Sequence, residues 1–145
     1  MARGRGMVQY TSEGVFEVPI NKVWELLNSP QSHEHRAIKR RRLIATQGSL
    51  ITIEVEVLDP DGKDTHFETW KMKMYPPKGY DLEISGGPMD GTKLTHHYTP
   101  MGGKTKVEVS GDVKVTGLAD SDALAAAEKF MDELHDEDQS NVKKL

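Results

Sequence analysis

The sequence predicts an α+β domain in which an antiparallel sheet packs against a long C-terminal helix. Between about residues 36 and 116, apolar and polar residues alternate, and turn signals interrupt the alternation at regular intervals. On both sides of this region the apolar residues change to a helical period. Because one side of a large antiparallel sheet is apolar, a long helix is expected to cover it.

The composition is that of a single globular domain. The chain has 145 residues, of which 36% are hydrophobic and 29% charged, enough for one core without disulfides or metals. The formal net charge of −4 argues against the positive field of a general nucleic-acid binder, but it leaves room for a local basic stripe. The absence of cysteine excludes disulfides, thiolate zinc sites and cysteine nucleophiles.

The first residues are set apart from the fold. The opening MARGRG is small and basic, so we expect residues 1–7 to be disordered or extended and residues 8–145 to form the domain. No apolar stretch is long enough for a signal-peptide core or a membrane span. The expected location is therefore the cytoplasm, and no transmembrane segment is expected.

A strand and a short helix begin the domain. Residues 8–18 are typical of a strand, and Gly14 within it suggests a bulge or a sharp bend. Pro19 is suited to a helix start, and Pro30 ends the helix. The spacing of four apolar residues places them on one face of this helix: Ile20, Val23, Trp24 and Leu27.

Six strands follow in a meander. The turn signals that separate them lie at residues 46–49, 59–64, 76–79, 86–91 and 100–104. Residues 51–57, ITIEVEV, place four apolar side chains on one face and three polar ones on the other, as expected for a sheet with one wet side.

The last helix is the longest. It is expected from Asp120 to about Lys143, with Asp120 and Asp122 as candidate N-caps. Its apolar stripe consists of Leu124, Ala127, Phe130, Met131 and Leu134.

Three features of the sequence resemble the START-like superfamily, also called SRPBCC. They are VFEVPINKVWELLNSP at residues 15–30, the six-strand meander, and AAAEKFMDEL at residues 125–134, and the resemblance covers about residues 8–140. Members of this superfamily include pollen-allergen proteins, lipid-transfer domains and polyketide cyclase/dehydrase proteins. Relatives often carry a Trp-Pro pair after the first helices, where this chain has HEHRAIKRRR at residues 33–42.

The resemblance implies the helix-grip fold, a curved seven-stranded antiparallel sheet wrapped on the C-terminal helix. It also implies a cavity between the sheet and that helix, which would hold a small hydrophobic or amphipathic ligand. The superfamily shares this shape and cavity but no universal catalytic motif.

Strand alternation predicts the lining of the cavity. In residues 65–75, Trp70, Met72 and Met74 alternate with lysines, and the same parity adds Glu68 and His66. The candidate ligand-binding residues are Phe16, Glu68, Trp70, Met72, Met74, His96, Tyr98 and Met131. Further residues that can complete the wall are Val18, Tyr80, Leu82, Ile84, Leu94, Leu124 and Leu134. A buried histidine and tyrosine can equally be ordinary hydrogen-bonded core residues, and methionines are as common in cores as in adaptable pockets.

The basic stretch has several interpretations. Strict alternation would place Arg40 and Arg42 on the face of Ile38 and Ile44, and would place Lys39 and Arg41 on the face of Leu43. The arginines can be solvated or paired with the acidic residues 132–138 within the molecule or in a dimer, or they can bind an anionic head group at the cavity rim. Nucleic acid is disfavoured, because no aromatic stacking residues accompany the basic run.

Metal and cofactor sites are not expected. His33 and His35 can share one face of an extended segment, but no carboxylate lies near them, or near the pair His96 and His97, at a ligand spacing. The glycines of residues 86–91 and 100–104 lie in hairpin turns and not at a phosphate-binding strand–helix junction.

The sequence therefore predicts a binding domain for a small hydrophobic or amphipathic molecule, as a monomer or a homodimer. One alternative is a cyclase/dehydrase-like enzyme that uses His96 or Glu68 as acid or base, although the sequence assigns no catalytic residue. Another is a protein-interaction domain whose cavity is filled by its own side chains.

Overall fold

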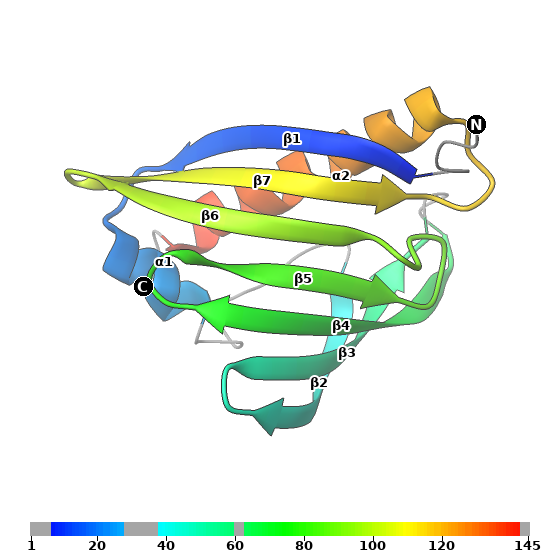
Figure 1. Cartoon of the computed structure of the whole chain (residues 1–145), viewed down its shortest axis with the longest axis horizontal. Helices are drawn as coiled ribbons and strands as arrows, with labels where there is room; N and C mark the ends of the chain where they lie inside the picture. Colours follow the sequence, from blue (N-terminus) through cyan, green and yellow to red (C-terminus); the bar gives the residue numbers. More distant parts are fainter. Residues whose placement is uncertain (1–6, 28–37, 60–62, 143–145) are drawn as a thin grey trace.

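The computed structural model describes residues 7–27, 38–59 and 63–142, and this part of the chain forms seven strands and two helices (Figure 1). In chain order the elements are β1 (Met7–Phe16), α1 (Ile20–Leu27), β2 (Ile38–Gln47), β3 (Leu50–Leu58), β4 (Thr65–Tyr75), β5 (Gly79–Ser85), β6 (Lys93–Met101), β7 (Lys104–Lys114) and α2 (Asp120–Val142).

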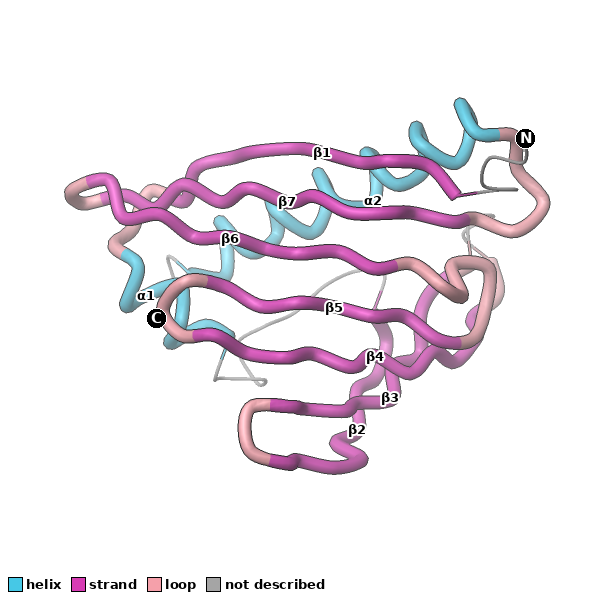
Figure 2. Tube along the Cα trace, in the orientation of Figure 1, coloured by secondary structure: helices cyan, strands magenta, loops and turns pink. Residues whose placement is uncertain are grey.

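The strands form one antiparallel sheet in the order β1-β7-β6-β5-β4-β3-β2. Strands β2 to β7 are a meander of neighbours, and β1 joins the sheet beside β7. Helix α2 runs along one face of the sheet behind β1, β7 and β6, and α1 lies near its C-terminal end (Figures 1 and 2). The predicted fold class, a seven-stranded antiparallel sheet gripping a long C-terminal helix, is thus confirmed.

The bulge that was one expectation for β1 is absent. The pairing of β1 with β7 continues without a register shift, and Gly14 lies opposite Val107. A Cβ atom on Gly14 would lie only 3.0 Å from Cε1 of His135 on α2. The glycine therefore permits a close approach of α2 to the sheet rather than a bulge.

The bulges lie instead in β2. Its register with β3 shifts between Ile38 and Arg40 and again between Leu43 and Ala45. Each extra residue reverses the faces of the side chains that follow it. The prediction that Ile38 shares a face with Arg40, Arg42 and Ile44 is therefore wrong. Ile38 shares its face with Arg41, because they lie opposite Val57 and Val55, two buried residues on the same face of β3.

The core consists of two hydrophobic clusters on the inner face of the sheet. The first gathers buried residues of β1, β6 and β7 with Val23 and Trp24 of α1, and the second gathers residues of β3, β4 and β5 with Ile38. The stripe of α2 packs against both, Ala127 with the first cluster and Phe130 with the second. α1 is anchored by the Trp24 indole, whose N–H donates to the Pro77 carbonyl at 3.0 Å.

Candidate ligand-binding cavity

A cavity of about 460 Å³ lies between the sheet and α2. This volume is within the range of sites for small organic molecules. Its wall is mainly apolar and aromatic, and its lining residues are Ser12, Glu13, Gly14, Phe16, Leu27, Ile38, Arg41, Leu43, Thr46, Ile51, Ile53, Trp70, Met72, Met74, Tyr80, His96, Tyr98, Val107, Val109, Met131, Asp132, Leu134, His135 and Asp138.

The structure brings most of the predicted residues to this wall. Seven of the eight candidates lie on it: Phe16, Trp70, Met72, Met74, His96, Tyr98 and Met131. Strand alternation positions the residues of β4 and β6, and the helical stripe positions Met131. Glu68 is buried but is not among the lining residues. Contact of these residues with a ligand stays a prediction.

Of the further residues predicted to complete the wall, only some lie on it. Tyr80 and Leu134 line the cavity. Five others do not: Val18, Leu82, Ile84, Leu94 and Leu124. Leu82 and Ile84 share the inner face but are buried within the second hydrophobic cluster. Facing inward is thus not sufficient to reach the open space, because neighbouring side chains cover part of the sheet.

His96 and Tyr80 form a stacked pair in the cavity wall. They lie directly opposite each other on β6 and β5, and their ring centroids are 4.3 Å apart with an interplanar angle of 10°. The Tyr80 and Tyr98 hydroxyls share a hydrogen bond. Trp24 meets Tyr98 edge-on at 5.8 Å. These aromatic contacts fix the rings and leave the cavity with a rigid wall on this side.

His96 is neutral in this environment. Burial lowers its pKa to about 4, although the charge of Asp138 acts in the opposite direction. Its Nδ1 is buried and makes no hydrogen bond within the part of the chain that the structure describes. His96 also lines the cavity, so its ring lies beside the space that a ligand would occupy.

The two tyrosine hydroxyls are held in their protonated form. Burial, reinforced by the nearby charge of Asp138, raises the pKa of both Tyr80 and Tyr98. At neutral pH these three rings thus present polar but uncharged groups to the cavity, beside the carboxylate of Asp138.

A second group of polar residues lines the cavity, and its three members from α2 were missed at the level of sequence. Arg41 comes from β2, and Asp132, His135 and Asp138 come from α2. His135 and Asp138 lie four and seven positions after Met131, and Asp132 lies three positions before His135, so an extended helical stripe would have included them. Arg41 was among the arginines considered for the cavity rim, but alternation alone left open which face of the strand turns inward, because the bulge after Ile38 is not visible in such a pattern.

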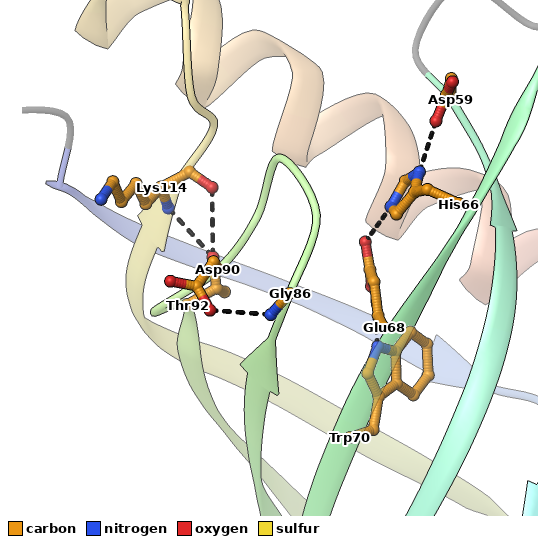
Figure 3. A network of polar contacts seen from close by, with 8 residues as sticks. All are labelled: Asp59, His66, Glu68, Trp70, Gly86, Asp90, Thr92 and Lys114. Carbon is orange, nitrogen blue, oxygen red and sulfur yellow. Dashed lines mark hydrogen bonds and ion pairs between the residues drawn. The ribbon is translucent and has the colours of Figure 1, made fainter.

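Glu68 belongs to a separate polar network at one end of β4 (Figure 3). Its Oε1 accepts the indole N–H of Trp70 at 2.9 Å, and its Oε2 lies 2.5 Å from Nε2 of His66. The other ring nitrogen of His66 contacts a carboxylate oxygen of Asp59. Burial lowers the pKa of His66, but the hydrogen bonds and charges of Glu68 and Asp59 outweigh it, so that the net shift is upward.

The arginines of β2 are divided between two environments. Arg40 and Arg42 form ion pairs at 3.1 Å with Glu56 and Glu54 of β3, on the outer face of the sheet. Arg41 faces the cavity. Within the described part of the chain the outward arginines thus pair with the neighbouring strand, whereas their pairing with the acidic residues of α2 in a dimer stays a prediction.

The structure describes only one of the two histidine pairs that the sequence offered as metal ligands. His33 and His35 lie outside the described residues. Over residues 7–27, 38–59 and 63–142, no group of three or more histidine and carboxylate side chains is arranged to hold a metal ion.

A cavity between an antiparallel sheet and a gripping C-terminal helix defines the helix-grip class of domain. The chain belongs to the family described as "Polyketide cyclase / dehydrase and lipid transport", whose model matches residues 7–145. This family is part of the START-like superfamily that the sequence resembles. No curated protein sequence matches the chain.

Solved structures share the fold at low sequence identity. TTHA0849 from Thermus thermophilus has a TM-score of 0.80 at 12% identity, covering 94% of this chain and 97% of that one. Ara h 8.0201 has a TM-score of 0.75 at 16% identity, covering 97% and 100%. The di-domain ARO/CYC StfQ of the steffimycin biosynthetic pathway has a TM-score of 0.73 at 11% identity, covering 95% of this chain but half of StfQ.

Neither of the two described helices combines the length and the apolar character that crossing a membrane requires.

Proposed function

We propose that the protein binds a small hydrophobic or amphipathic molecule in the cavity between the sheet and α2. The observation that carries this proposal is the open volume of about 460 Å³ behind a mainly apolar wall. Pockets of this kind, with a few convergent polar groups, are typical of small-molecule sites. The cytoplasmic location and the monomeric or homodimeric state stay predictions.

The polar lining suggests the chemistry of the ligand. Neutral His96 and the paired tyrosine hydroxyls suit an uncharged hydroxyl or carbonyl group on an otherwise apolar body. Arg41 suits an anionic group, but the carboxylates of Asp132 and Asp138 share the cavity with it. A panel of ligands with one apolar skeleton and alcohol, carboxylate or amine head groups separates these preferences.

Catalysis is the second candidate, and His96 is the residue that favours it. It lies in the cavity with a free ring nitrogen among the described residues, whereas Glu68 is engaged by His66 and Trp70. A general base works best when its pKa is near the operating pH. A pKa of about 4 makes His96 a weak base at neutral pH and supports a hydrogen-bonding role in binding instead.

The third candidate, a protein-interaction domain with a filled cavity, has less support. The cavity is open, and the outward arginines Arg40 and Arg42 are engaged with glutamates of the same chain. Exposed ion pairs of this kind leave little net positive charge for an acidic partner.

The binding proposal predicts that blocking the cavity removes ligand without unfolding the protein. Met72→Trp fills part of the open space, and Met101→Trp makes the same change at an exposed position at the end of β6. Native mass spectrometry of the protein purified from its own host, with denaturing extraction of any bound molecule, identifies the ligand class. We expect Met72→Trp to weaken binding by about tenfold or more, which is about 1.4 kcal/mol, and Met101→Trp to leave it unchanged.

Equal binding by both variants would contradict a site in this cavity. A clean apo mass for the wild-type protein, followed by no binding to the ligand panel, would shift the weight to catalysis or protein interaction.

A further inference from the structure

A continuous chain of hydrogen bonds links the surface of the molecule to the cavity wall. It runs from Asp59 at the end of β3 through His66 and Glu68 to Trp70 on β4 (Figure 3). The three β4 residues point to the same side because they alternate along the strand. Only the last of them, Trp70, lines the cavity.

Burial increases from Asp59 through His66 to Glu68. The side chain of Asp59 is 27% exposed, that of His66 is 19% exposed, and that of Glu68 is 2% exposed. A buried carboxylate is costly unless it is hydrogen-bonded or paired. Glu68 has two such partners, the His66 ring and the Trp70 indole, so its position depends on both.

The His66 ring is held between two carboxylates. Its charged neighbours are Asp59 from β3 and Glu68 from β4. The backbone of Gly87, in the loop between β5 and β6, covers the ring so closely that a Cβ atom there would lie 2.5 Å from its Cδ2. The ring therefore cannot turn away easily when its protonation changes.

The contacts require a proton on each ring nitrogen. Carboxylate oxygens only accept hydrogen bonds, and a neutral imidazole has one N–H donor and one acceptor nitrogen. Loss of one proton would place a nitrogen lone pair against a carboxylate oxygen, at either Asp59 or Glu68. Both contacts persist only in the doubly protonated, positively charged ring.

We infer that Glu68 and His66 are positioning residues for Trp70, and that loss of the proton on Nε2 of the His66 ring releases Glu68 and loosens the indole in the cavity wall. Glu68 acts through its hydrogen bond to the indole, and His66 acts through Glu68. The consequence for ligand affinity rests on the proposed binding function, whereas the coupling between the ring and the indole does not.

The coupling is measured first in the protein without ligand. The chain has two tryptophans, so Trp24→Phe leaves a single indole N–H signal in a proton–nitrogen NMR spectrum. We expect this signal of Trp70 to shift with pH at the midpoint of the His66 ring, which lies above 6.5 because its pKa is raised. If Trp24→Phe does not fold, the wild-type protein has two indole signals, and Trp70 is the one that changes in Glu68→Gln.

Three variants separate positioning from general stability. His66→Gln should abolish the pH-dependent shift of the indole signal. Glu68→Gln keeps an acceptor for the indole but removes a negative charge beside the ring, so it should lower the midpoint of His66. His97→Gln is the matched control, because His97 is exposed on the outer face beside Glu108, and it should leave the shift unchanged.

Ligand affinity is then measured across the same midpoint. We expect it to fall about fivefold or more as His66 loses its proton, a modest coupling between two sites, and to become independent of this titration in His66→Gln. An indole signal that does not change while the His66 ring titrates would overturn the inference even if ligand binds. A titrating indole in a protein that binds no ligand would support the inference and contradict the proposed function.

Discussion

His96 and His66 show how the same side chain takes opposite roles a few strands apart. His96 faces an apolar cavity, and burial depresses its pKa to about 4. His66 faces two carboxylates, which raise its pKa despite its burial. The surroundings of His96 therefore favour the neutral ring, whereas those of His66 favour the charged ring.

The environment of His96 predicts a loss of stability in acid. Between pH 6.5 and about 4 the unfolded chain binds a proton on this ring and the folded chain does not, so the free energy of unfolding decreases as the pH falls. Each pKa unit corresponds to about 1.4 kcal/mol, so the full effect of the ring is up to about 3 kcal/mol. Urea unfolding at pH values across this interval measures it.

His96→Phe tests the assignment, because phenylalanine keeps the ring stacked on Tyr80 but binds no proton. We expect its stability to depend less steeply on pH than that of the wild type, whereas His97→Gln should retain the wild-type slope. An identical slope in all three proteins would show that His96 does not cause the acid sensitivity.

Residue by residue, sequence reasoning succeeded where a side chain follows a regular period. The alternation of Trp70, Met72 and Met74 with lysines predicted that all three face inward, and all three lie on the cavity wall. Glu68 follows the same alternation, but its carboxylate forms hydrogen bonds with His66 and Trp70. The pattern gives the direction of a side chain and not the partner it meets.

At the level of elements, the contact between α2 and β1 depends on a few specific residues. Gln139 of α2 accepts a hydrogen bond from the Glu17 backbone N–H at 3.0 Å and donates one to the Val15 carbonyl at 2.8 Å. Gly14 provides the space for His135 beside these two hydrogen bonds. The C-terminal part of the helix is thereby fixed to the end of the first strand.

Loss of the two Gln139 hydrogen bonds should loosen α2 without disrupting the core. We expect Gln139→Ala to lower the free energy of unfolding by about 1 kcal/mol, the typical net value of hydrogen bonds of this kind. Ser140→Ala, a change at the exposed neighbouring position, should stay within about 0.5 kcal/mol of the wild type. Urea denaturation of both variants measures the difference. Equal free energies of unfolding for Gln139→Ala and Ser140→Ala would mean that the two Gln139 hydrogen bonds contribute nothing to stability.

The predicted elements were correct in type and order, because their periods are long and regular. The short helix, the meander and the long helix all agree with the structure. The exceptions are the irregularities: of the bulge or sharp bend expected at Gly14 the bulge is absent, and two bulges in β2 were not expected. Gly14 indicates a position where the backbone is not restricted by a side chain. Whether it forms a bulge or makes room for a neighbour depends on α2, which is distant in the sequence.

For the whole molecule, an open cavity has a cost in stability. Protein interiors are normally close-packed, and space without atoms forfeits contacts that would stabilise the fold. A protein that keeps about 460 Å³ open therefore exchanges some stability for the capacity to bind.

This exchange predicts opposite effects of one substitution on stability and binding. Met131→Phe adds volume at the cavity wall, so we expect it to raise the free energy of unfolding of the ligand-free protein by about 0.5–1 kcal/mol and to weaken ligand binding. Leu124→Phe is the control on the same helix, because Leu124 packs against the first cluster and does not line the cavity. It should destabilise the protein by overpacking. A loss of stability in Met131→Phe would contradict the proposed exchange.

The overall architecture was accessible from the sequence because it depends on many residues that agree with one another. The chemistry of the ligand was not accessible from the sequence, because ligand choice depends on the few polar groups that the fold brings together from β2, β6 and α2. Arg41 and Asp138 lie far apart in the chain, and neither has a local pattern that indicates a common cavity.

The irregular course of β2 has a consequence for the behaviour of the protein in concentrated solution. β2 is the last strand of the sheet, and a straight outer strand is a template on which other chains can add and aggregate. Two bulges interrupt its regular spacing, and Lys39, Arg40 and Arg42 are exposed along it. The irregularity that turns Arg41 into the cavity thus also discourages the growth of intermolecular sheets from this edge.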